Sequence, residues 1–174
     1  MGTINSEDFG RDLLEALHKL ETDENITLTK DQKLLLAERG SLEQTLSIIV
    51  NSPIRVEIVK QARDAQNHHV ITREAWLKDI TGRRLVHATT IYNLEWLPED
   101  DLHPDLYKEV EEELLIGHVG IGSVIMKHQL ATYRRIKKIG YDREKRNLFR
   151  VYQIVVDRDA VFEIHEEFSR DSFL

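Results

Sequence analysis

The hydrophobic period of this chain changes at about residue 54, and that change restricts the possible folds more than any other feature. Before Pro53, apolar residues recur at the three- and four-residue spacing of amphipathic helices. After Pro53, apolar and polar residues alternate, which is the pattern of half-buried strands. Helices followed by a run of strands predict an α+β fold rather than a helical bundle or an alternating α/β sheet.

Six segments have the two-residue period of strands. They are residues 54–62, 68–80, 83–92, 131–141, 147–156 and 160–169. The connections Thr81-Gly82 and Asp157-Arg158-Asp159 are typical of hairpin turns, and short turns join antiparallel neighbours. We therefore expect a six-stranded, largely antiparallel sheet with helices packed on one face.

Three helices are predicted before the sheet. The first follows Ser6 and has an apolar stripe formed by Phe9, Leu13, Leu17 and Leu20. Two capping-box patterns, at residues 29–32 and 41–44, begin the second and third helices. Gly40 ends the second helix, and Asn51-Ser52-Pro53 ends the third.

A longer excursion separates the third and fourth strands. It contains a predicted helix at residues 105–115 and then the sequence GHVGIG, residues 117–122. The expected organisation is one domain over residues 1–174, mainly helical over 1–50 and mainly sheet over 54–169, with this insertion at about 104–128.

Length, charge and composition exclude several classes of protein. A chain of 174 residues is large enough to bury roughly 70% of its surface without disulfides. Its formal net charge of −7 argues against a nucleic-acid binder, so the basic stretch at 133–146 is interpreted as a solvated strand and turn. No apolar run approaches the roughly 20 residues of a membrane span, and residues 1–10 do not resemble a secretion signal. With no cysteine, a disulfide or thiolate site is impossible, and we expect a cytoplasmic protein.

Two charged residues interrupt apolar rows of predicted strands. In the second strand Arg73 shares a face with Ile71, Ala75 and Leu77, and in the last strand Glu166 occupies the same kind of position. A buried charge is costly unless it is paired or, for a carboxyl group, protonated. Two interpretations follow: a structural ion pair or an exposed face, or a shared pocket for a small polar ligand.

Three other motifs have simpler explanations. The Ser41 pattern begins a helix, whose free N–H groups also suit a carboxylate, although Glu43 would repel an anion if it pointed inward. The glycines of GHVGIG do not match a nucleotide-binding fingerprint, and a flap over a pocket is the better interpretation. The eight histidines have no ligand spacing, and no metal or other cofactor is expected.

An ordered set of segments resembles the chorismate pyruvate-lyase family. It consists of RGSLEQTLSIIVNSPIRVEIVKQ at 39–61, the Arg of VITREAWL, the Ile-Gly of GHVGIGSVIM and the HEEF of the last strand. The resemblance covers about 39–168 and implies a six-stranded antiparallel sheet with helices packed on it. It also implies conversion of chorismate to 4-hydroxybenzoate and pyruvate without metal or cofactor.

The resemblance assigns four site residues. Arg73 corresponds to the arginine that binds the ring carboxylate, and Glu166 to the carboxylate beside the hydroxyl of the product. Leu42 corresponds to the position whose backbone N–H meets the ring carboxylate, and Ile121 to an apolar pocket residue that is normally leucine. The third strand lacks the family's Gly-Arg-Thr run, and the position of Arg150 relative to the family is open, so the group that holds the second carboxylate is not assigned.

Two functions are consistent with these features. One is a lyase in which Arg73 and Glu166 act on an aromatic or cyclohexadienyl carboxylate. The other is a non-catalytic sensing or binding domain for such a small molecule, related to effector domains of GntR-type regulators. Neither requires a nucleic acid or a membrane as partner, and the oligomeric state is not predicted.

Overall fold

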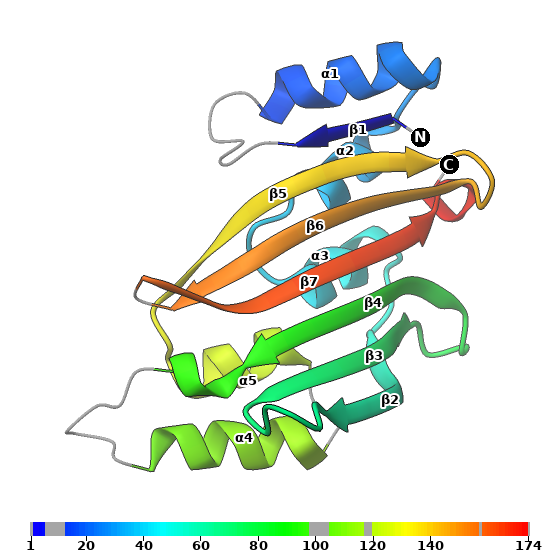
Figure 1. Cartoon of the computed structure of the whole chain (residues 1–174). Coiled ribbons are helices and arrows are strands. Elements are labelled where there is room, and N and C mark those ends of the chain that lie inside the picture. Colours follow the sequence, from blue (N-terminus) through cyan, green and yellow to red (C-terminus); the bar gives the residue numbers. More distant parts are fainter. Residues whose placement is uncertain (1, 6–12, 98–104, 117–119, 157, 174) are drawn as a thin grey trace.

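The structure is a computed structural model that describes residues 2–5, 13–97, 105–116, 120–156 and 158–173. Its helices precede and interrupt one continuous antiparallel sheet (Figure 1). The helices are α1 (Leu13–Glu24), α2 (Lys30–Ala37), α3 (Leu42–Ile49), α4 (Leu106–Ile116) and α5 (Ile121–Lys127), with 3-10 turns η1 (Leu94–Trp96) and η2 (Arg170–Phe173). The strands are β1 (Gly2–Asn5), β2 (Arg55–Arg63), β3 (Val70–Lys78), β4 (Arg84–Asn93), β5 (Thr132–Asp142), β6 (Asn147–Val156) and β7 (Asp159–Ser169).

The α+β class and the antiparallel sheet are confirmed. All six predicted strands form, as β2 to β7, and the sheet order is β1-β5-β6-β7-β4-β3-β2. Strand β1, which pairs with β5 at the edge of the sheet, was not predicted. A strand of four residues is too short for a two-residue period to be recognised.

The predicted turn at Thr81-Gly82 joins β3 to β4. The Asp79 carboxylate accepts hydrogen bonds from the backbone N–H groups of Thr81, at 2.9 Å, and Arg83, at 3.1 Å. Gly82 has a φ of +86°, in the left-handed region that glycine adopts without strain. In the second predicted turn, Asp157 lies outside the described residues.

Helices α2, α3 and α5 cover one face of the sheet, as predicted (Figure 1). The Thr29 capping box is present in both directions, and Ser41 caps α3 through its side chain, 3.4 Å from the backbone nitrogen of Gln44. Leu35 and Leu46 are fully buried against this face, and burial of one such side chain contributes about 2–3 kcal/mol. Residues 6–12, which include the predicted start of the first helix, lie outside the described residues.

The insertion differs from the prediction at GHVGIG. Gly120 is the N-cap of α5 and Gly122 lies in its first turn, so the loop predicted there is wrong for these positions. Val124 and Ile125 are buried one turn after Ile121, and this helical spacing outweighs the cost of a glycine in the first turn. Residues 117–119 lie outside the described residues, and a flap remains a prediction.

Among the helices of the described residues, none has both the length and the apolar character required to cross a membrane.

Candidate functional site

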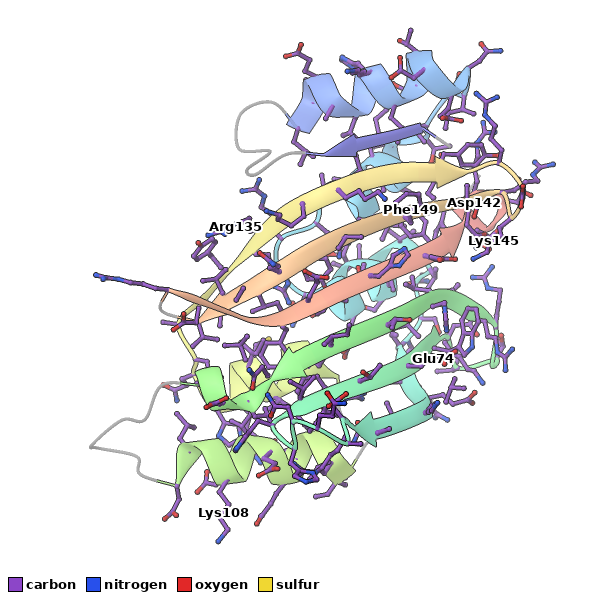
Figure 2. The ribbon with its side chains drawn as sticks, viewed as in Figure 1. Glu74, Lys108, Arg135, Asp142, Lys145 and Phe149 are labelled. Atoms are coloured by element: carbon purple, nitrogen blue, oxygen red, sulfur yellow. The ribbon has the colours of Figure 1, made fainter. Side chains whose placement is uncertain are left out.

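Strand alternation directs three arginines toward the helix-covered face of the sheet. Figure 2 shows Glu74, Arg135 and Phe149 on the opposite, open face. Their neighbours in sequence, Arg73, Arg134 and Arg150, therefore belong to the covered face. Arg73 and Arg150 are 2% and 1% exposed, so these charges must be compensated inside the protein.

Strand register places the polar groups of this face in two adjacent rows. One row runs from Arg73 through Thr90 and Ile164 to Tyr152, across β3, β4, β7 and β6. The next row runs through Ala75, Ala88, Glu166 and Arg150 across the same strands. The two rows bring together side chains that are far apart in sequence.

Apart from Arg150, the residues of these rows form one wall of a cavity beneath α3 and α5. The opposite wall consists of Ser41, Leu42 and Glu43 at the start of α3 and Gly120, Ile121 and Gly122 at the start of α5. The space open to the centres of water molecules is about 60 Å³, inside an empty volume of about 560 Å³ that includes adjoining solvent. A cavity forms here because the paired positions 75 and 88 carry alanine rather than a larger apolar residue. Its size suits a small molecule.

All four residues predicted from the sequence line this cavity. Arg73 and Glu166 reach it from β3 and β7, while Leu42 and Ile121 reach it from α3 and α5. Arg73 and Glu166 are both buried, as the pocket interpretation requires. Their roles toward a ligand remain predictions.

Glu166 forms an ion pair with Arg150. The Arg150 Nε atom lies 2.6 Å from Glu166 Oε2, and the hydroxyl of Tyr152 donates to Glu166 Oε1 at 2.8 Å. Because both partners are donors, both carboxylate oxygens act as acceptors. Glu166 therefore forms a structural ion pair, but its partner is Arg150 rather than the expected Arg73, and a ligand-binding role of the pocket stays a prediction.

The environment of Arg150 and Tyr152 keeps both side chains as hydrogen-bond donors to Glu166. Burial opposes the charge of Arg150, but Glu166 and Tyr152 outweigh it, so the pKa of the guanidinium is raised. Arg150 Nη1 also donates to the carbonyl of Glu38 at 2.6 Å. Burial, followed by the negative charge of Glu166, raises the pKa of Tyr152, so its phenol remains a hydrogen-bond donor.

Burial is the main influence on the pKa of Arg73. It lowers the pKa of the guanidinium, and Tyr92 and Glu43 act in the opposite direction. An arginine remains protonated at neutral pH despite such a shift. Arg73 therefore presents a fixed positive charge to the cavity.

Glu43 is a second carboxylate on the cavity wall. Its Oε2 atom lies 3.5 Å from the Ser123 hydroxyl, and a side chain on Gly120 would overlap its Oε1 atom. Burial raises the pKa of Glu43, Glu166 adds to this effect, and Ser123 and Arg73 oppose it. Glu43 points inward, where an ionised carboxylate would repel an anion as anticipated, and protonation relieves that repulsion.

The raised pKa of Glu43 predicts a pH-dependent stability. The folded chain binds this proton more tightly than the unfolded chain, so the free energy of unfolding decreases as pH rises through the raised pKa. We expect E43Q to have nearly the wild-type Tm at about pH 4 and a growing advantage toward about pH 8. Thermal unfolding by circular dichroism tests this, with E163Q, an exposed change on β7, as control. An equal offset of E43Q at both pH values would contradict it.

Four further residues line the cavity and were not assigned to it from the sequence: Glu43, Thr90, Arg134 and Tyr152. The pairing of Arg150 with Glu166 was also not assigned. The alternation test alone would have found Arg150, which interrupts the apolar row of β6 just as Glu166 interrupts that of β7. Among the described residues, no group of three histidine or acidic side chains is placed to hold a metal ion.

Comparisons with known proteins give one informative match. No protein-family model matches the chain. A curated protein of Methanocaldococcus jannaschii named "Putative lyase MJ0807" is 30% identical over 154 residues, and the match covers 82% of this chain and 79% of that protein.

Proposed function

Because this chain belongs to the same family as the Methanocaldococcus jannaschii protein named "Putative lyase MJ0807", we propose that it is a lyase that eliminates pyruvate from chorismate to give 4-hydroxybenzoate. One observation carries the proposal: a buried arginine and a buried glutamate from distant strands face one small, largely apolar cavity. An aromatic or cyclohexadienyl carboxylate matches such a cavity in charge and polarity.

The reaction balances without water, a redox partner or a metal. The bond between a ring carbon and the ether oxygen of the enolpyruvyl group breaks, and the electron pair leaves with that oxygen. The adjacent ring carbon, which carries the hydroxyl group, loses a proton as the ring becomes aromatic. Enolpyruvate becomes pyruvate when its methylene carbon takes up a proton. Aromatisation supplies the driving force, so the protein has mainly to position the substrate and exclude water.

The cavity residues divide these tasks. Arg73 binds the ring carboxylate with its two-pronged guanidinium, assisted by the backbone N–H of Leu42 in the first turn of α3. Ile121 packs against the ring. Glu166 accepts a hydrogen bond from the ring hydroxyl, beside the carbon that loses its proton and next to the ether oxygen. Arg150 and Tyr152 orient Glu166 through both of its oxygens.

The binding-domain alternative predicts the same cavity without turnover. Helices α1 to α3 do not form a separate DNA-binding unit, because Leu20, Leu35 and Leu46 are fully buried in the core. Thr29 and Gln32 also hydrogen-bond to the carbonyls of Phe173 and Arg170 near the C-terminus. These contacts favour the enzyme over a regulator built on the N-terminal helices.

Incubation with chorismate distinguishes the two functions. We expect 4-hydroxybenzoate and pyruvate in equal amounts, measured by chromatography and by a lactate dehydrogenase-coupled assay, with heat-denatured protein as control. An A88L variant, which fills the cavity and leaves every charge in place, should lose this activity. Stabilisation by 4-hydroxybenzoate without any turnover of chorismate would instead establish a binding domain.

A further inference from the structure

A third arginine of the covered face, Arg134, lies on the cavity wall at the far side from Arg73. It belongs to β5, whereas Arg73 belongs to β3, and β6, β7 and β4 lie between these strands. Four strand spacings of about 4.8 Å separate the two backbones by roughly 19 Å. The two side chains thus enter the cavity from opposite ends.

The guanidinium of Arg134 is positioned but not neutralised. Its Nη1 atom donates to the carbonyl of Arg39 at 2.9 Å, and its Cζ atom lies 5.9 Å from the ring centre of Tyr152. A Cβ on Gly122 would lie 3.7 Å from Nη2, an ordinary van der Waals contact. A guanidinium has five N–H donors, and within the described part of the chain no carboxylate forms an ion pair with Arg134.

The charged side chains around the cavity determine which ligand charge it favours. Arg150 and Glu166 neutralise each other through their ion pair. Arg73 and Arg134 are the other cations of the cavity wall, and Glu43, whose pKa burial raises, is the other acid. Protonation of Glu43 leaves positive charge in excess around the cavity, in a chain whose net charge is −7.

We infer that Arg134 binds a second anionic group of the ligand, so that the site selects a dianion with carboxylates at opposite ends over a monocarboxylate. The inference rests on the proposed function, for which it supplies the residue that holds the enolpyruvyl carboxylate. It has a consequence for turnover. Once pyruvate has left, 4-hydroxybenzoate keeps its contacts with Arg73, Leu42 and Glu166 but no longer contacts Arg134.

Two stable ligands that differ only in the second carboxylate test the inference. The dianion is 3-(carboxymethoxy)-4-hydroxybenzoate and the monoanion is 4-hydroxy-3-methoxybenzoate, and isothermal titration calorimetry measures both. We expect the wild-type protein to bind the dianion about tenfold or more tightly, the gain of a charge-assisted hydrogen bond. In R134Q the two affinities should become nearly equal, with that of the monoanion unchanged. R135Q, a change on the same strand but on the open face, should retain the wild-type preference.

The outcomes separate this inference from the proposed function. Equal affinities in the wild-type protein, no measurable binding of either ligand, or equal losses for both ligands in R134Q would overturn the role of Arg134. Dianion preference that depends on Arg134, in a protein that does not convert chorismate, would retain the inference and overturn the lyase. Conversion of chorismate without a preference for the dianion would retain the lyase and overturn the role of Arg134.

Discussion

Replacement of Arg73 by alanine is expected to weaken binding of 4-hydroxybenzoate by roughly 30-fold to several thousand-fold. Truncation of one member of a buried charge pair costs about 2–5 kcal/mol. Arg73 is 2% exposed, so water cannot take over its contact, and the carboxylate of the ligand would enter a largely apolar cavity without its cation. R73K retains the charge but not the bidentate fork and should have an intermediate affinity.

Isothermal titration calorimetry at constant ionic strength measures this loss, and R55Q, an exposed change on the neighbouring strand β2, is the matched control. The folded state gains little from the charge of Arg73, because burial lowers its pKa. An R73M variant, which keeps the length of the side chain, should therefore have a Tm within a few degrees of wild type while ligand binding is lost. Wild-type affinity in R73A would show that the carboxylate binds elsewhere.

The strands and the inward direction of Arg73 and Glu166 were predictable because alternation is a local property. Each residue is the single charge in an otherwise apolar row, and the structure buries both. The same test on β6 places Leu148, Arg150, Tyr152 and Ile154 on one face. Counting outward from the predicted turn at residues 157–159 even pairs Arg150 with Glu166, as observed. The ion-pair partner of Glu166 was thus predictable from strand alternation and the position of the turn, but it was not predicted.

Arg134 and Glu43 were not predictable in this way. Two adjacent arginines, Arg134 and Arg135, must point to opposite faces, and the charged run around them does not indicate which one is covered. A bulge between Ile136 and Lys138 further shifts the pairing of β5. The inward direction of Glu43 depends on where α5 packs against α3, which is a tertiary arrangement with no sequence period.

Replacement of Glu166 by glutamine is expected to lower kcat for chorismate by about 10²- to 10⁴-fold, the usual contribution of one acid–base group. Affinity for 4-hydroxybenzoate should change by less than about tenfold, because the carboxylate of the ligand contacts Arg73 and a glutamine oxygen still accepts one hydrogen bond. The same change leaves Arg150, which is 1% exposed, without its counter-charge, and an uncompensated buried charge costs about 3–5 kcal/mol. Loss of folding must therefore be separated from loss of chemistry.

The double variant E166Q/R150M makes that separation, because it removes both charges of the pair. Replacement of a buried ion pair by uncharged groups is often neutral for stability, so the double variant should recover most of the Tm that E166Q loses. Single-turnover assays, performed where circular dichroism shows each variant to be folded, should find no recovery of the chemical step. E163Q, on the opposite face of β7, controls for removal of a negative charge. If turnover returned together with the Tm, Glu166 would serve only to neutralise Arg150, and the elimination would have to proceed through positioning by Arg73 and the apolar walls alone.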